Sequence, residues 1–229
     1  MGKFIVIEGT DGAGKSTQTK RLAEYLKKKG LRVKTFHFPS GKGFYGEIVN
    51  AFLRGDYGKV EEVDPYFVAF AFAGDRKETA EEVRRWLQEY DVVLMDRYTF
   101  SNIAYQCAKL EEEQEQKKLM DWIFRLEFEV FRIPKPDLSV FLNVPESFTR
   151  RQLDRERTGA EREYLRGKSD VHEDSLELQR RVRKQYTVMC REYAEIVLLD
   201  CTNENGAMLH GDKIQKRIIR LLREAGIID

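Results

Sequence analysis

The chain alternates short apolar runs with longer stretches in which apolar residues recur every three or four positions. Residues 3–8 hold Phe-Ile-Val-Ile between polar ends, and a glycine-rich turn follows at once, which indicates a fully buried strand. Further on, Leu22, Ala23 and Leu26 recur at helical spacing before a glycine stop, so a helix is expected over about residues 16–29. The first predicted unit is therefore strand, glycine turn, helix.

The same alternation continues toward the C-terminus. Further apolar runs predict strands over 31–38, 91–95, 137–142 and 195–199. Helical patterns cover roughly 46–54, 65–89, 111–131, 145–155, 173–193 and 212–224. Strands that alternate with helices predict right-handed crossovers and a parallel sheet. Because no repeat or linker interrupts the pattern, we expect one α/β domain over residues 1–229, with a five-stranded parallel sheet and helices on both faces.

The turn after the first strand carries the most specific motif. Residues 9–16 fit G-x-x-x-x-G-K-[ST] between a predicted strand and a helix, the setting of a phosphate-binding loop (P-loop). In such a loop backbone N–H groups and the helix N-terminus surround a phosphate, the lysine reaches the outer phosphates, and the hydroxyl completes a Mg²⁺ shell. The motif predicts a nucleoside triphosphate and Mg²⁺, held by Gly9, Thr10, Asp11, Gly12, Ala13, Gly14, Lys15 and Ser16. Switches, motors and small-molecule kinases share this loop. It therefore indicates the phosphate donor, and the acceptor must be inferred from other segments of the chain.

An acid and an arginine follow the third predicted strand. Asp96 and Arg97 come just beyond its carboxyl end, where ligands of parallel sheets bind. Asp96 is placed, with Ser16, to organise Mg²⁺ or its waters. Arg97 can donate to oxygens of donor and acceptor phosphates together and bring two repelling anions into line. A surface salt bridge between neighbours is the alternative.

Two further groups of side chains could hold an acceptor. Phe72 and Arg76 share a helical face, giving a flat ring and an anion clamp one turn apart, as one mononucleotide requires, although Phe72 alone would be ordinary core. Ser101, Asn102 and Tyr105 also share a helix face. An amide can read a pyrimidine edge and a bulky ring could exclude a 2′-hydroxyl, while helix capping and packing remain the alternative for these three.

A basic segment overlaps the end of the predicted helix 145–155 and precedes the predicted helix 173–193. Residues 150–168 contain seven basic residues among four acids, with glycines at 159 and 167 as pliable points. We interpret this segment, about 150–170, as a mobile lid whose guanidinium groups close over the phosphates and expel water. A charged surface helix would explain the composition almost as well.

Composition narrows the class of protein. The 229 residues include 40 Lys and Arg and 39 Asp and Glu, a net charge of +1, so no surface-wide attraction to nucleic acid or membrane is implied. No apolar stretch approaches the roughly 20 residues of a membrane span, and an early acid argues against a secretory signal. The three scattered cysteines argue against a disulfide framework or zinc cluster. We expect a cytoplasmic protein without nucleic-acid or membrane partners.

With these segments assembled, the chain resembles the thymidylate (dTMP) kinase family of P-loop nucleoside monophosphate kinases, from Phe4 to about Asp200. The matching segments are Ile-Glu-Gly-Thr-Asp-Gly-Ala-Gly-Lys-Ser-Thr-Gln (7–18), Phe-Pro (38–39), Phe-Ala-Gly-Asp-Arg (72–76), Asp-Arg-Tyr-Thr-Phe-Ser-Asn-Ile-Ala-Tyr-Gln (96–106), Pro-Lys-Pro-Asp-Leu (134–138) and Asp-Val-His-Glu (170–173). The Asp-Arg-Tyr segment is the specific one, since the P-loop alone is shared by many families.

The resemblance implies roles residue by residue. The loop from Gly9 to Thr17 would cradle ATP, Asp11 would bind the acceptor's 3′-hydroxyl, and Phe72 would stack on thymine. Arg76 and Arg97 would hold the acceptor phosphate, Asn102 would face the base, and Tyr105 would disfavour ribose. The P-loop has no arginine, so this looks like the type whose catalytic arginine lies in the lid, here Arg155 or Arg157. A homodimer is typical of the family.

The resemblance therefore predicts transfer of the γ-phosphoryl group of ATP to dTMP, giving dTDP and ADP. Another nucleoside or nucleotide kinase, acting on dUMP, CMP or a deoxynucleoside, is the nearest alternative. A nucleotide-dependent switch is a less favoured alternative. The chain has no Asn-Lys-x-Asp motif of the kind that recognises the base in GTPases, and its sequence predicts a second nucleotide pocket.

Overall fold

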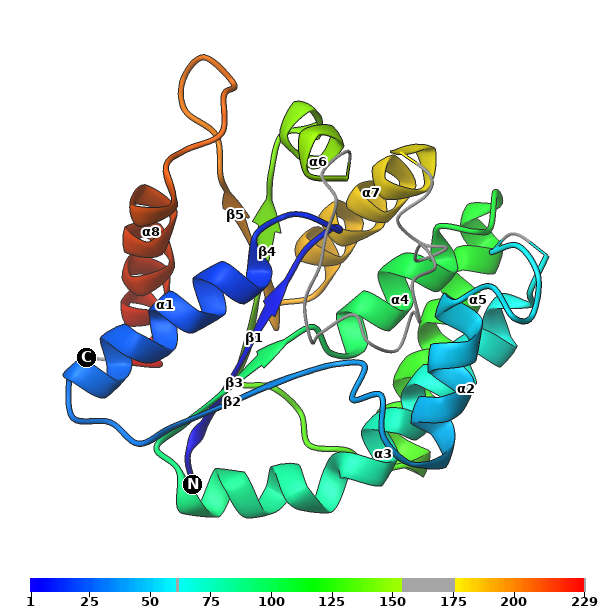
Figure 1. Ribbon diagram of the computed structural model, residues 1–229, viewed down its shortest axis with the longest axis horizontal. Coiled ribbons are helices and arrows are strands. Elements are labelled where there is room, and N and C mark those ends of the chain that lie inside the picture. Colours follow the sequence, from blue (N-terminus) through cyan, green and yellow to red (C-terminus); the bar gives the residue numbers. More distant parts are fainter. Residues whose placement is uncertain (61, 154–175, 229) are drawn as a thin grey trace.

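The computed structural model describes residues 1–60, 62–153 and 176–228 of the chain (Figure 1). The strands are β1 (Lys3–Glu8), β2 (Val33–His37), β3 (Val92–Asp96), β4 (Leu138–Asn143) and β5 (Ile196–Asp200). The helices are α1 (Lys15–Lys28), α2 (Gly43–Leu53), α3 (Pro65–Glu89), α4 (Thr99–Cys107), α5 (Glu113–Phe124), the π-helix η1 (Arg125–Val130), α6 (Glu146–Leu153), α7 (Leu176–Glu192) and α8 (Gly211–Glu224).

The strands form one sheet in the order β2-β3-β1-β4-β5, and every neighbouring pair is parallel. The α/β class and the five-stranded parallel sheet are confirmed, and each strand lies within two residues of its predicted limits. Central β1 is buried along almost its whole length because helices cover both faces, which explains its uninterrupted apolar run.

Helices lie on both sides of the sheet (Figure 1), and successive side chains of β1 belong to two different apolar clusters. Ile5 and Ile7 pack with Leu22 of α1 and Ile218 of α8. Phe4 and Val6 point the other way, into a cluster with residues of α3, and α4, α5 and α7 pack over the adjoining part of that face. Because successive side chains of a strand point to opposite faces of the sheet, both faces present apolar side chains to helices, as the sequence predicts.

Most helix boundaries lie within three residues of the prediction, and two helical segments differ from it in kind. The predicted helix 111–131 begins at Glu113 and changes to π-helical geometry over Arg125–Val130, where the N–H of Phe131 donates to the carbonyl of Leu126, five residues back, at 2.8 Å. A π-turn inserts one extra residue and re-aims the side chains that follow. Helix α4 was absent from the predicted elements, although the shared face of Ser101, Asn102 and Tyr105 assumed a helix there.

The sheet brings the two strongest motifs to one edge. β1 leads directly into the P-loop, and β3 leads into Asp96 and Arg97. Ile7 of β1 pairs with Asp96 of β3, and the N–H of Arg97 donates to the Ile7 carbonyl at 3.0 Å. The carboxyl ends of the two strands therefore meet side by side, as ligand binding at this edge requires.

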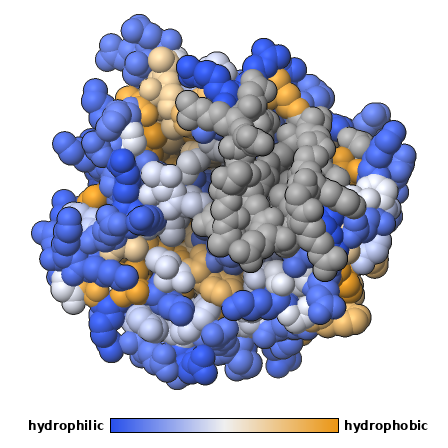
Figure 2. All heavy atoms as spheres, in the orientation of Figure 1, coloured by the Kyte–Doolittle hydropathy of each residue, from blue (hydrophilic) through white to orange (hydrophobic). Residues whose placement is uncertain are grey.

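Among the described residues, no helix is both long enough and apolar enough to cross a membrane. The face in Figure 2 is predominantly hydrophilic where its residues are described, with apolar side chains in small patches.

Candidate active site

The P-loop is shaped by glycines with positive φ. Gly12 and Gly14 have φ angles of 75° and 84°, a left-handed conformation that glycine adopts without a Cβ penalty. Gly14 precedes the first residue of α1, so the loop lies at the helix N-terminus, where anions bind favourably. The loop therefore has the backbone of a phosphate cradle.

Lys15 lies folded against this loop. Its Nζ donates to the carbonyl of Thr10 at 2.9 Å, and the residue is only 7% exposed. Burial, helped by the positive charge of Arg97, lowers the pKa of the Lys15 amine to about 8. A bound phosphate would supply the negative charge that this buried ammonium needs.

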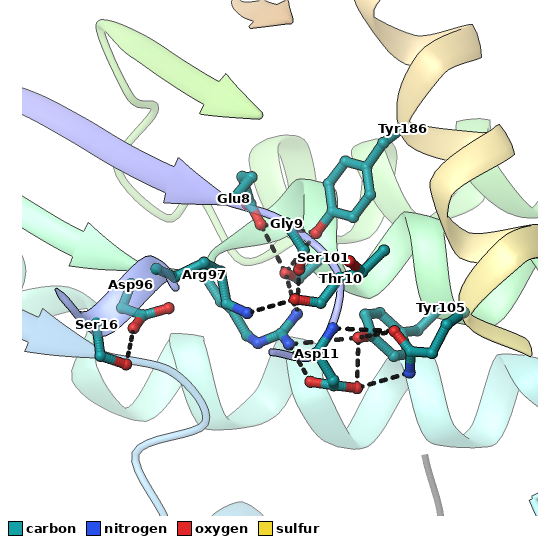
Figure 3. Close-up of polar contacts among 12 residues, drawn as sticks. Glu8, Gly9, Thr10, Asp11, Ser16, Asp96, Arg97, Ser101, Tyr105 and Tyr186 are labelled. Atoms are coloured by element: carbon teal, nitrogen blue, oxygen red, sulfur yellow. Dashed lines mark hydrogen bonds and ion pairs between the residues drawn. The ribbon is translucent and has the colours of Figure 1, made fainter. Parts of the chain in front are cut away.

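The predicted metal-binding pair is formed. The hydroxyl of Ser16, in the first turn of α1, donates to Oδ2 of Asp96 at 2.7 Å (Figure 3). Mg²⁺ takes one or two protein oxygens and completes its shell with phosphate oxygens and waters, so this pair fits Mg²⁺ beside a P-loop. Among the described residues, no group of three or more His, Cys, Asp or Glu side chains could hold a metal ion.

Arg97 turns back from the end of β3 toward the P-loop (Figure 3). Its φ of 67° is unusual for a residue with a side chain, and such strain is often found at functional sites. Nη1 donates to the carbonyl of Gly9 and to Oγ of Ser101, both at 3.1 Å. Nη2 pairs with the carboxylate of Asp11 and lies 3.3 Å from the Tyr105 hydroxyl. One guanidinium thus joins the donor loop to the predicted acceptor residues.

Asp11 is held from α4 and α7 as well. The Tyr105 hydroxyl donates to Asp11 Oδ2 at 2.6 Å, and Nε2 of Gln179 donates to the same oxygen at 2.8 Å. Oε1 of Gln179 accepts the backbone N–H of Asp11 at 2.9 Å. Gln179 is not among the predicted site residues, because a glutamine in a charged amphipathic helix carries no distinguishing signal.

A second missed residue, Glu8, is fully buried at the end of β1. Its carboxylate accepts hydrogen bonds from the hydroxyls of Ser101 at 2.6 Å and Tyr186 at 2.8 Å, and from the N–H of Tyr98 at 3.0 Å. Burial raises the pKa of Glu8, although these hydrogen bonds oppose the rise. Ser101 therefore links a buried carboxylate to Arg97, a role that neither of its predicted alternatives, a contact with substrate or helix capping and packing, describes.

Arg76 lies deeper than the sequence suggests. Its Nε and Nη2 donate to Oε2 and Oε1 of Glu127 at 2.8 and 2.6 Å, and both side chains are almost completely buried. Asn102 donates to the same carboxylate at 3.0 Å. Phe72, one turn before Arg76 on α3, is half-buried and packs edge to face with Phe52. Glu127 was not predicted, because nothing in its sequence context sets it apart from the other acids of that helix.

The structure thus places most of the predicted site at one edge of the sheet. Two groups result: Lys15, Ser16, Asp96, Arg97, Asp11, Ser101 and Tyr105 around the P-loop, and Arg76 with Asn102 on the neighbouring helices α3 and α4. Arg155 and Arg157, and most of the predicted lid, lie outside the described residues.

Comparisons with known proteins show the family to which the chain belongs. A family model described as thymidylate kinase matches residues 7–210. A thymidylate kinase of Mycobacterium tuberculosis is 34% identical over 190 residues, which cover 82% of this chain and 86% of that protein. A probable thymidylate kinase of Thermococcus gammatolerans is 32% identical over 209 residues, covering 89% and 90% of the two chains.

The fold is shared with solved structures as well. A thymidylate kinase from Candida albicans superposes with a TM-score of 0.73 at 20% identity, over 99% of this chain and 93% of that one. A thymidylate kinase from Ehrlichia chaffeensis gives a TM-score of 0.64 at 21% identity, over 96% and 98% of the two chains. At such identities the likeness supports the P-loop α/β fold.

Proposed function

Because the chain belongs to the thymidylate kinase family, we propose that it transfers the γ-phosphoryl group of ATP to dTMP, giving dTDP and ADP. One observation supports this most directly: Arg97, from the end of β3, lies against the carbonyl of Gly9 and the carboxylate of Asp11 in the P-loop. A guanidinium that can hold an acceptor phosphate is therefore within reach of the loop that holds the donor.

Catalysis in this proposal rests on positioning and charge. Backbone amides of the loop from Gly9 to Thr17 hold the phosphates of ATP, and Lys15 exchanges its contact with the Thr10 carbonyl for the outer phosphates. Arg97 aligns the acceptor phosphate with the γ-phosphate and stabilises the charge that develops during transfer. No covalent intermediate with the protein is required.

Ser16 and Asp96 would hold Mg²⁺, directly or through its waters. The ion would neutralise phosphate charge at the donor. The hydroxyl and carboxylate are already in contact, so the protein presents both oxygens together without rearranging its backbone.

The acceptor would lie between α3 and α4. We assign the 3′-hydroxyl of dTMP to Asp11, the stacking contact to Phe72, and the base edge to Asn102. Arg76 helps to hold the acceptor phosphate, Ser101 orients Arg97, and the ring of Tyr105 would exclude a ribose 2′-hydroxyl. The contacts of Asp11 with Arg97 and Tyr105 support this grouping, because they bring the sugar-binding and phosphate-binding residues together.

The lid and the assembly complete the proposal. Arg155 or Arg157 would supply a further catalytic guanidinium from a lid over about residues 150–170 of a single domain. A homodimer would use the face of α2, α3 and η1, where large apolar side chains are exposed; these are Phe44, Phe67, Phe70 and Val130. Size-exclusion chromatography with light scattering tests the dimer. The cytoplasmic location stays a prediction.

An acceptor panel tests the function. ADP release from ATP and Mg²⁺ is followed with dTMP, dUMP, CMP and thymidine under the same conditions. We expect dTMP to give the highest kcat/KM. Preference for another monophosphate or for a nucleoside would assign a different kinase activity, and nucleotide binding without any acceptor-dependent ADP release would favour the switch.

A further inference from the structure

Glu127 occupies the centre of the helical layer next to the proposed acceptor site. It lies in the π-helix η1, is fully buried, and faces α3 and α4. The π-helical geometry, with its bond from Phe131 to the Leu126 carbonyl, re-aims this part of the helix. A buried carboxylate is costly unless its oxygens are paired, so its partners show what it does.

In the described part of the chain, the hydrogen-bond partners of this carboxylate are all donors. Oε1 accepts from Nη2 of Arg76 at 2.6 Å and from Nδ2 of Asn102 at 3.0 Å. Oε2 accepts from Nε of Arg76 at 2.8 Å and from the hydroxyl of Thr99 at 2.7 Å. The arrangement suits an ionised carboxylate, and it joins α3 and α4 through one side chain.

The contacts decide what Asn102 can offer a ligand. Its Nδ2 is used by Glu127 and by the carbonyl of Ala69 at 3.0 Å. Turning the amide over would place its oxygen against the Glu127 carboxylate, so its orientation is fixed. In the described part of the chain Oδ1 of Asn102 is buried and has no hydrogen-bond partner. A buried acceptor without a partner is unfavourable, and a donor from a bound ligand would satisfy it.

Arg76 is fixed by the same carboxylate. Its Nε and Nη2 both donate to Glu127, and these two parallel hydrogen bonds set the plane of the guanidinium. Nη1 is the nitrogen that this pairing leaves for a ligand. The orientation of a donor on α3 and of an acceptor on α4 therefore depends on one buried side chain.

We propose that Glu127 is the positioning residue of the acceptor site, fixing Arg76 and Asn102 in the arrangement that receives the nucleotide monophosphate. This rests on the proposed function. Glu127 does not touch the reacting atoms; it acts through the two side chains that it orients. Its removal should therefore weaken binding of the acceptor and leave the P-loop unchanged.

Glu127→Gln is the informative variant. It keeps the size of the side chain but turns one acceptor oxygen into an NH₂ group, which must then face a donor, either of Arg76 or of its neighbours. We expect KM for dTMP to rise by roughly 10- to 100-fold, with kcat changed less than threefold or so and KM for ATP unchanged. Glu127→Asp keeps the charge opposite Arg76, and its shorter side chain should raise the same KM less.

Thr99→Val is the matched control. It removes another hydrogen bond to the same carboxylate without touching Arg76 or Asn102. It should lower Tm and leave KM for dTMP near the wild-type value, which separates loss of stability from loss of positioning.

The outcomes are distinct. Absence of dTMP turnover in the wild-type protein would remove the proposed function itself. Active wild-type protein together with a folded Glu127→Gln or Glu127→Asp variant of unchanged KM for dTMP would overturn the role of Glu127. A parallel loss of kcat and both KM values, or failure of both variants to fold, would make Glu127 a residue of the fold only and overturn the role as well.

Discussion

Raising the pH should weaken ATP binding well below the pH at which an ordinary lysine loses its proton. Lys15 is buried, and burial together with the charge of Arg97 lowers its pKa from 10.5 to about 8 in the free protein. ATP binding requires the ammonium form, so the apparent Kd should rise about tenfold per pH unit above 8. At pH 9 the Kd should be roughly ten times its neutral-pH value, whereas an ordinary lysine would produce almost no change.

The Lys15 amine should also make the stability of the folded protein depend on pH, in the opposite direction to ATP binding. Between pH 8 and 10.5 the unfolded chain holds the Lys15 proton and the folded chain does not. Stability linked to Lys15 therefore rises with pH in this window, by at most about 3.4 kcal/mol, and is lowest when the buried amine is charged below pH 8. Thus ATP binding weakens while the folded protein gains stability from this residue.

Isothermal titration calorimetry with ATP from pH 7 to 9.5 provides the assay, and urea unfolding over pH 7 to 10.5 measures the stability. Lys15→Met is the control, because its side chain has similar length and no charge: it should bind ATP weakly at every pH and lack the wild-type dependence. A wild-type Kd that is constant up to pH 9.5, or that changes in parallel in the variant, would refute the reasoning about the buried amine.

Other substitutions test separate parts of the account. Arg97→Ala should lower kcat by roughly 10³-fold, since the guanidinium aligns both phosphates, and near-normal turnover in the acceptor assay would overturn that role. Arg76→Ala should chiefly raise KM for dTMP, by about tenfold or more, and an unchanged KM would remove it from the acceptor site. Ser16→Ala should raise the Mg²⁺ concentration for half-maximal activity about tenfold, as a magnesium titration would show, whereas an unaltered requirement would place the ion elsewhere. Phe141→Ala should lower the free energy of unfolding, measured in urea, by about 3–5 kcal/mol, because the ring is fully buried and stacks on Tyr186 with the ring centroids 4.5 Å apart. A loss below about 1 kcal/mol would contradict this packing.

The sheet was predictable because its strands follow simple rules. Strands buried on both faces appear as continuous apolar runs, and those of β1 and β3 end in the two polar motifs that function requires. A parallel sheet then brings the ends of neighbouring strands together, so the approach of Arg97 to the P-loop follows from topology.

Buried partners of the site were not predictable in the same way. Glu8 and Glu127 look like surface acids in the sequence, because charged residues are seldom fully buried without partners. Their partners come from distant segments, Tyr186 for one and Arg76 for the other. The π-turn that presents Glu127 was not predicted either, because the sequence was interpreted as one continuous helix over about 111–131.

The most direct test of the central claim is a crystal structure with a non-hydrolysable ATP analogue and dTMP bound together. We expect the analogue's phosphates in the loop around Lys15, and the dTMP phosphate against Arg97, pointing at the terminal phosphate of the analogue. Thymidylate bound away from Arg97, or absent at saturating concentration, would contradict the account.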